Sequence, residues 1–579
     1  MATISAYPVL DFKGGIRRDK SPLEMDRTEL LDARNVEIDE LGRVKTRRGS
    51  FQYGNTLTGT LDNSFVFTRL VTGGLPTVSQ IVASRASPTV LSRVITSRLT
   101  TSITPASTTV VVQSTSTSDA AFAASGTIEI EGDLIAYTSL NGDGVTFDGV
   151  TGITSSHAAG ASVHQYVTIS QATNVDGRNG VYFAVLNNTL VINGRVGVSL
   201  LINNDDGITT SNITGEPAGL FATNYRERMY MAGDGTSGTN GGTSRVSFSN
   251  RGDPATWTTA SDYFDVEEQR GEFITGFRVL NDRMLIFKMN STFAYDEIQL
   301  KQYTVGVGAY NHRVTQEINS LCYTFCPEGI FATTGSEAKQ IGDPVKEYWK
   351  NFLPVYDTTK ERVVLNCFSG KFEDNYLLYI GNVTEPTTQN DVVLVYNTTA
   401  KNWRVYQGLT NFTHFGSFDR WRDGDAGKRL QDKAVLFAGD SGGKYWRMFE
   451  SRYLDNQSTP VKQGGDVFKD LVSDTGVPVS TMIETPLYDM GQPSLFKIAK
   501  RLRVYSERGL WSFEYRVENE KEITPYKPLG VTTKTNQVLD LPKESAGYRI
   551  GLRISAVNSG SQSILNGFVF EDVTVNPRA

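Results

Sequence analysis

The residues that could support catalysis are few and far apart in this chain. Its four histidines lie in three different segments, at His157, His164, His312 and His414. A Ser-His-Asp triad or a zinc site needs such residues to converge. The sequence also contains no HExxH or P-loop motif. We therefore predict no catalytic, cofactor-binding or metal-binding residues.

Carboxylate chemistry needs no histidine, so a glycosidase is the catalytic alternative, with Asp262, Asp265, Glu267 and Glu268 as its acids. Their spacing alone selects no acid–base pair, and acidic residues are abundant in turns. Solvated loop charges are the favoured interpretation. We predict that the protein is not an enzyme.

The chain has three cysteines, Cys322, Cys326 and Cys367. The first two occupy positions i and i+4 of an alternating strand, where their side chains share a face but lie more than about 10 Å apart. We predict buried thiols rather than a metal site. Three cysteines in so long a chain also form no disulfide framework, which favours assembly in a reducing cytoplasm.

Two short motifs have both a functional and an architectural interpretation. Arg251-Gly252-Asp253 spells the tripeptide of adhesion ligands, but Pro254 and Trp257 follow it in a turn-like stretch, which favours a structural role. The residues Arg43, Lys45, Arg47 and Arg48 form the densest positive cluster, with Arg17 and Arg18 before it. This cluster predicts either contact with an acidic partner protein or a solvated hairpin edge.

The overall charge argues against binding nucleic acid by bulk attraction. With 57 Lys and Arg against 63 Asp and Glu, the formal net charge is −6 over 579 residues. Such a balance suits a surface past which DNA slides. The first 20 residues lack the pattern of a signal peptide, and no apolar run approaches ~18 residues, so neither that secretion route nor a membrane span is expected.

The elements that would position these residues read as short β-strands. Pairs of apolar, alternating segments recur at intervals of about 40 to 50 residues, with no helical pattern between them. They favour a β-propeller over a stacked array of β-sandwiches. Helix is expected only near 22–33 and 343–351, and a hairpin is expected to turn at Glu40-Leu41-Gly42.

Changes in composition divide the chain into four parts. We predict an all-β protein with an N-terminal segment and the first propeller strands in 1–95, and a Thr/Ser-rich inserted β module in 96–167. The remainder of the β-propeller follows in 168–476, and a C-terminal β-sandwich in 477–579.

Three stretches resemble the nozzle or tail-hub proteins of short-tailed bacteriophages. The first, LDARNVEIDELGRVKTRRGS from Leu31, matches the opening of those chains at Asn35, Val36, Gly42, Arg43, Arg48 and Gly49. The second combines the turn VSFSNRGDPATW with a following ITG…LIFK hairpin, and matches at Ser249, Gly252, Asp253, Pro254, Trp257, Ile274, Thr275, Gly276 and Phe287. The third is the insert, which is similar to a small β module of phage structural proteins.

The resemblance implies a structural protein of the virion tail, assembled in the bacterial host cytoplasm. It implies a ring, a homohexamer, joined to the portal and head-to-tail adaptor and to tail fibres or a needle. The lumen of that ring would conduct double-stranded DNA during ejection without recognising its sequence. A carbohydrate-binding adhesin of the host surface and a propeller glycosidase or depolymerase are the alternatives.

Overall fold

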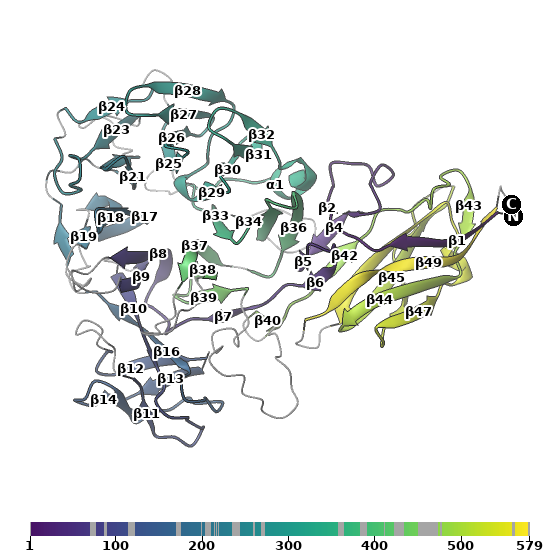
Figure 1. Ribbon diagram of the computed structural model, residues 1–579, viewed down its shortest axis with the longest axis horizontal. Coiled ribbons are helices and arrows are strands. Elements are labelled where there is room, and N and C mark those ends of the chain that lie inside the picture. The colour runs from purple at the N-terminus through teal and green to yellow at the C-terminus, as the bar shows by residue number, and fades with distance from the viewer. Residues whose placement is uncertain are drawn as a thin grey trace.

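A computed structural model shows a chain built almost entirely of β-strands around a β-propeller (Figure 1). It describes residues 2–576 apart from 70–76, 86–89, 114–121, 132, 170–174, 198–199, 203–209, 214, 216, 218, 234–243, 259–260, 268–271, 357–363, 382–390, 410, 422–432, 450–472, 475–476, 521 and 558–561. The all-β, propeller-like fold predicted from the sequence is confirmed.

Within the described residues, seven antiparallel blades of four strands surround the propeller axis. Blade 1 has β8 (Thr60–Arg69), β9 (Thr77–Arg85), β10 (Val90–Arg98) and β16 (Ser162–Thr168). Blade 2 has β17 (Val175–Leu186), β18 (Thr189–Gly197), β19 (Leu200–Ile202) and β20 (Thr210–Asn212). Blade 3 has β21 (Phe221–Tyr225), β22 (Arg228–Ala232), β23 (Arg245–Phe248) and β24 (Tyr263–Asp265).

The remaining blades follow in chain order. Blade 4 has β25 (Ile274–Leu280), β26 (Arg283–Lys288), β27 (Ser291–Tyr295) and β28 (Leu300–Val305). Blade 5 has β29 (Gln316–Ile318), β30 (Leu321–Cys326), β31 (Gly329–Thr333) and β32 (Ala338–Gln340). Blade 6 has β33 (Cys367–Phe372), β34 (Asn375–Ile380), β35 (Val392–Asn397) and β36 (Asn402–Tyr406).

Blade 7 joins strands from distant parts of the chain. Its inner strands are β37 (Phe412–Trp421), β38 (Lys433–Asp440) and β39 (Tyr445–Met448), and its outer strand is β7 (Ser50–Gln52). The innermost strand β37 lies beside β8 of blade 1, which completes the circle. Two further short strands, β40 (Ser473–Asp474) and β41 (Val477–Pro478), extend blade 7 beyond β7.

Two-residue turns connect the inner hairpins of blades 2 to 5. The turn residues are Asn187-Asn188, Arg226-Glu227, Asn281-Asp282 and Asn319-Ser320, and both residues of every pair have positive φ. A type I′ turn requires that conformation, which Asn and Asp tolerate better than most residues. The same turn therefore recurs from blade to blade although the surrounding sequences differ.

The insert interrupts blade 1 between its third and fourth strands. Its strands β12 (Gly126–Ile130) and β13 (Asp133–Tyr137) continue the sheet of blade 1 outward from β16. A second small sheet contains β11 (Thr109–Val111), β14 (Ser139–Leu140) and β15 (Thr146–Asp148). The two sheets enclose a separate hydrophobic core that includes Phe122, Ile135 and Phe147, so the insert has its own interior.

The β-sandwich combines both ends of the chain. One sheet contains β1 (Ala2–Val9), β5 (Val36–Ile38), β6 (Val44–Thr46), β43 (Phe496–Ile498), β44 (Arg501–Arg508), β47 (Asn536–Asp540) and β49 (Ile564–Asn576). β5 and β6 form the predicted hairpin. In β1 and β49, Ala2 lies opposite Val575, so the first strands belong to the domain assigned to 477–579 from the sequence (Figure 1).

The second sheet of the sandwich is continuous with blade 6. Next to β36 it contains β4 (Asp32–Arg34), β42 (Met482–Glu484), β48 (Arg549–Val557), β45 (Leu510–Glu518) and β46 (Lys527–Val531). Asn35, with φ of 54°, makes the connection. Its amide donates to the carbonyl of Val405 (2.8 Å), and its side-chain Nδ2 donates to that of Ser480 (2.7 Å).

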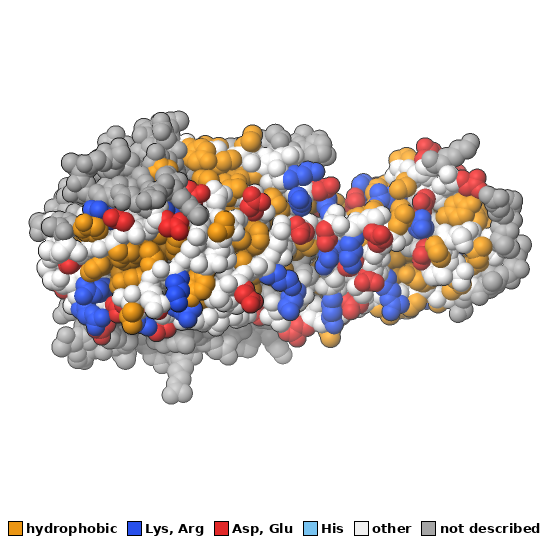
Figure 2. All heavy atoms as spheres, turned by 90° about the horizontal axis from the view of Figure 1, so that it is seen from above, with side chains coloured by type: hydrophobic (Ala, Val, Ile, Leu, Met, Phe, Trp, Pro, Cys, Tyr) orange, Lys and Arg blue, Asp and Glu red, His pale blue; other side chains and the backbone are white. Residues whose placement is uncertain are grey.

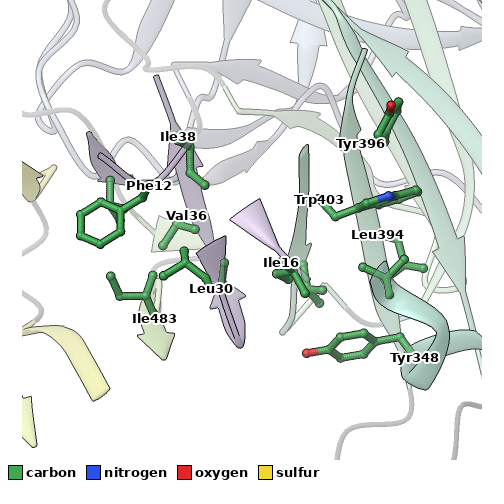
Figure 3. Close-up of a cluster of buried hydrophobic side chains, with 14 of the residues drawn as sticks. Phe12, Ile16, Leu30, Val36, Ile38, Tyr348, Leu394, Tyr396, Trp403 and Ile483 are labelled. Carbon is green, nitrogen blue, oxygen red and sulfur yellow. The ribbon is translucent and has the colours of Figure 1, made fainter. Parts of the chain in front are cut away.

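One hydrophobic core crosses the junction of propeller and sandwich (Figure 3). Phe12, Leu30 and Ile483 face Leu394 and Trp403 of blade 6 across it. Because a packed core and a shared sheet both connect the two domains, we expect them to move as one body.

Helix is confined to single turns in the described residues. The predicted helix near 343–351 is confirmed by η4 (Asp343–Val345) and α1 (Lys346–Trp349), and two other turns are η3 (His312–Val314) and η5 (Lys543–Ser545). The predicted helix at 22–33 is wrong. This stretch contains turns, then β3 (Glu29–Leu30), which pairs in parallel with β2 (Gly15–Ile16), and then β4. Sheet pairing of its apolar residues outweighed their helical spacing.

Candidate functional site

A five-residue segment, Asn311–Thr315, lies among the innermost strands of the propeller and is called the axial segment here. It contains η3 and connects blade 4 to blade 5. The segment contacts residues of five inner strands, namely Asp62 of β8, Tyr182 of β17, Phe221 of β21, Phe277 of β25 and Ser369 of β33. The axial segment therefore closes the propeller axis at this level.

Asn311 fixes the conformation of the axial segment. Its Oδ1 accepts hydrogen bonds from the amides of Arg313 (2.8 Å) and Val314 (3.1 Å), which caps η3. Its Nδ2 donates to the carbonyls of Val364 (2.7 Å) and Cys367 (2.9 Å). One side chain thus holds the turn and attaches it to blade 6.

His312 serves as a buried hydrogen-bond acceptor. Its Nδ1 accepts from the amide of Phe277 (3.1 Å), and its ring stacks on Phe221 with centroids 5.2 Å apart. Burial, together with the nearby charges of Arg278 and Arg313, holds the pKa of His312 well below its ordinary value. The imidazole is therefore neutral at physiological pH and positions the backbone of blade 4.

A buried charge cluster joins the axial segment to blade 1. Asp62 accepts from Arg313 (3.2 Å), from Arg85 (2.7 Å) and from the amide of Val181. Burial alone would raise the pKa of Asp62, but the two guanidinium charges outweigh it and hold that pKa below its ordinary value. The cluster joins three segments that are far apart in the sequence.

A serine and a histidine also meet near the axis, between blades 1 and 7. The Nε2 of His414 lies 3.2 Å from the Oγ of Ser64, which also accepts from the hydroxyl of Tyr445 (2.5 Å). The Nδ1 of His414 faces the hydroxyl of Thr413 rather than a carboxylate. Burial lowers the pKa of His414 to about 3, so this pair is a structural hydrogen bond within a closed interior.

The acidic residues of the catalytic alternative are engaged in local structure. Asp265 forms a bidentate ion pair with Arg245, with N–O distances of 2.9 and 3.2 Å. The Cζ of that guanidinium lies 3.5 Å from the ring centroid of Tyr263. The carboxylate of Asp262 accepts from the hydroxyl of Ser261. Glu267 has φ of 40° at the end of blade 3, and Glu268 lies outside the described residues. These contacts single out no acid–base pair.

The three cysteines are buried as free thiols, in agreement with the interpretation drawn from their strand spacing. Burial raises the pKa of Cys322 to about 12 and also raises the pKa of Cys326 and Cys367. In the described part of the chain, no group of three or more His, Cys, Asp or Glu residues could hold a metal ion.

The Arg251-Gly252-Asp253 tripeptide connects neighbouring blades. Arg251 pairs with Glu297 of blade 4 (3.0 Å), and the carbonyl of Gly252 accepts from Asn187 of blade 2 (2.8 Å). Asp253 accepts from the amide of Ala255 (2.8 Å) and shapes the turn. These contacts agree with the architectural interpretation of the motif.

The basic cluster is largely neutralised within the chain. Arg43 pairs with Asp39 (2.7 Å) and Glu507 (2.6 Å), and Lys45 also pairs with Asp39. Arg47 is buried and donates to the Oδ1 of Asn35 (3.0 Å) at the junction of the two domains. The cluster stabilises the junction and the sandwich edge.

The insert contains a buried histidine between two carboxylates. The Nδ1 of His157 lies 2.9 Å from Glu131, and its Nε2 lies 2.9 Å from Asp133. Burial would lower the pKa of His157, but the two carboxylates outweigh it and raise that pKa. The pKa of Asp133 is held far below its ordinary value by hydrogen bonds from Thr154, His157 and Ser155, which outweigh its burial.

These shifts predict that the insert is most stable between about pH 4 and 6.5. The raised pKa of His157 contributes stability that is fully present below about pH 6.5. That stability is lost as the pH rises through the pKa of His157 in the folded protein. The depressed pKa of Asp133 contributes stability that is present above about pH 4 and is lost in strong acid. Hydrogen exchange of β12 and β13, corrected for chemical exchange rates, should show easier opening at pH 9 than at pH 6.

The variant His157→Gln is expected to remove the alkaline part of this dependence, because it leaves no proton to lose. Amides of blade 4 provide the internal control and should open equally at both pH values. An unchanged pH dependence in His157→Gln would contradict the assignment.

Comparison with known proteins identifies no family for this chain. No protein-family model matches the chain, and no curated protein matches its sequence. Among solved structures, the chain is similar to YCF48 bound to a D1 peptide, at 8% identity and a TM-score of 0.34 over 72% of this chain and 97% of that one. It is also similar to BamB from Moraxella catarrhalis, at 8% identity and a TM-score of 0.28 over 61% and 100%.

Among the described residues, no helix is long and apolar enough to cross a membrane.

The sequence analysis missed the axial segment and the Asp62 cluster. A lone Asn-His-Arg sequence gives no signal, because its partners come from five different blades.

Proposed function

We propose that this chain is a structural subunit of a ring at the end of the tail of a short-tailed bacteriophage, through which double-stranded DNA passes during ejection. The observation that supports it best is the sheet shared by blade 6 and the sandwich. A sheet and a core that both cross the junction make one stiff, elongated unit, and a load-carrying ring needs such units.

The residues that carry the resemblance to tail proteins support this proposal through their positions. Asn35 connects the propeller to the sandwich, and Gly42, with φ of 82°, closes the β5–β6 hairpin. Trp257 donates from Nε1 to the carbonyl of Pro254 (2.9 Å) and packs between blades 2 and 3. These four matched residues, Asn35, Gly42, Pro254 and Trp257, are framework positions rather than reactive ones.

The proposed conduit would be the lumen of the ring rather than the propeller axis, because the axial segment closes that axis. Internal pairing of Arg18 with Asp32, and of Arg43 with Asp39, also leaves fewer free positive charges to hold phosphates. Six copies, contacts with portal and adaptor proteins, and attachment of fibres or a needle complete the proposal and rest on the resemblance.

Imaging tests this proposal directly. Electron microscopy of the purified full-length chain, and of virions that carry it, is expected to show a six-fold ring at the distal end of the tail tube. A trimeric spike, or a location at the fibre tips, would favour the adhesin. Cleavage of host polysaccharide that is lost in Asp265→Asn but retained in the surface variant Asp572→Asn would favour the glycosidase instead.

A further inference from the structure

The outer edges of the blades differ along the propeller rim. In blades 1, 6 and 7, strands of this chain add to the outermost blade strand, namely β12 on β16, β4 on β36 and β40 on β7. In the described residues, the sheets of blades 2 to 5 end at β20, β24, β28 and β32. The rim of this propeller therefore accepts additional strands at three blades and presents open edges at four.

Strand β28 is the longest and least protected of the four open edges. It has six residues, whereas β20, β24 and β32 have three each. Proteins protect edge strands by shortness, charge, proline or bulges. β28 contains a bulge at Tyr303 but no proline and one charged residue, Lys301. The sandwich edge β46, by comparison, contains both Lys527 and Pro528.

Two exposed apolar side chains lie at the two ends of β28, namely Ile298 in the turn before it and Val305 as its last residue. Ile298 is 85% exposed and Val305 is 73% exposed, the highest values among the large hydrophobic residues that the structure describes. The view onto this rim shows hydrophobic side chains gathered over the propeller (Figure 2). Because of these positions, the two side chains mark opposite ends of an edge of six residues, about 20 Å at ~3.3 Å per residue. A strand added along the whole of β28 would reach both ends.

The middle of the edge is positively charged. Lys301 is exposed and forms no ion pair with any described residue. The guanidinium of Arg283, also exposed, reaches the hydroxyl of Tyr303 (2.6 Å). An acidic side chain near the centre of an added strand would meet both charges.

We propose that the outer edge of β28 binds an extended segment of another protein, which adds to blade 4 as a fifth strand and has apolar residues at both ends and an acidic residue near its middle. Backbone hydrogen bonds to β28 supply affinity, and Ile298, Lys301 and Val305 select the sequence. The strands β12, β4 and β40 show the same mode of addition within this chain. This inference holds whether or not the proposed tail function does.

A peptide-binding experiment with the full chain tests this inference. The probe is a fluorescein-labelled nine-residue peptide in which valine and threonine alternate and the central residue is glutamate. We expect fluorescence anisotropy to give a Kd below about 1 mM. Val305→Lys and Ile298→Lys are each expected to weaken binding by at least about tenfold, because they replace an apolar contact by a charge.

Charge reversal gives a second readout. Lys301→Glu is expected to weaken binding of this peptide and to favour a peptide with central lysine. Val531→Lys, at an exposed valine of the sandwich edge β46, is the matched control and should bind as the original chain does. Hydrogen exchange should slow in 300–305 when the peptide is bound, and the melting temperatures of all variants should agree.

Several results would overturn the inference. They are no binding up to about 1 mM peptide, equal binding by Val305→Lys and the original chain, or protection outside β28. Concentration-dependent dimerisation in sedimentation, lost in Val305→Lys, would show that a second copy of this chain is the occupant and would overturn the partner assigned here.

Discussion

Replacing Asp62 by asparagine is expected to lower the free energy of unfolding by about 2–4 kcal/mol, because the partly buried guanidinium groups of Arg85 and Arg313 would lose the buried carboxylate that balances their charge. The amide retains the size of the carboxylate, so the loss reports charge rather than a cavity. Chemical denaturation followed by tryptophan fluorescence measures the effect. The melting temperature should fall in parallel.

The matched control is Asp265→Asn, which breaks the more exposed pair with Arg245 and should change stability by about 1 kcal/mol or less. The triple variant Asp62→Leu, Arg85→Met and Arg313→Met should recover much of the lost stability, since no buried charge remains. A loss at Asp62→Asn no larger than at Asp265→Asn would show that the axial cluster does not need its charge balance.

Replacing Trp403 by alanine is expected to destabilise the protein by about 3–5 kcal/mol and to weaken the coupling between propeller and sandwich. Its ring is fully buried in the core that crosses the junction, 4.8 Å from the ring of Tyr396, and its Nε1 donates to the carbonyl of Ile341 (2.8 Å). Scanning calorimetry should show one unfolding transition in the original chain and two in the variant.

The conservative variant Trp403→Phe separates packing from hydrogen bonding. Phenylalanine fills most of the space but cannot make the hydrogen bond to the carbonyl of Ile341. We therefore expect the free energy of unfolding to fall by about 1 kcal/mol and the protein to unfold in a single transition. If Trp403→Ala also unfolds in one transition, then the shared sheet alone couples the two domains.

The local elements of this fold could be predicted from sequence because their signals are local. The β5–β6 hairpin follows from alternation around Gly42, and the insert follows from its change in composition and its short alternating runs. The recurring turns, such as Asn187-Asn188 and Asn281-Asp282, also leave a signal of two polar residues between apolar strands. Counting those turns would have indicated blades where no repeated motif is visible.

The long-range features could not be predicted because their partners are distant in sequence. Nothing in the first residues shows that Ala2 lies opposite Val575, or that Ser50 pairs with Met448. Asp62 gives no sign of its partners, since Arg313 is 251 residues away. The helix expected at 22–33 failed for the same reason, because pairing with Ile483 and its neighbours decides the conformation of this segment.

The pairing of Ser50 with Met448 and of Ala2 with Val575 also has a consequence during synthesis. Neither domain can close until the strand that completes it has left the ribosome. At about 5–20 residues per second, translation of 579 residues takes about half a minute to two minutes. Through most of that time the nascent chain carries unclosed blades, so we expect it to need chaperones and to be sensitive to proteases until its last strand emerges.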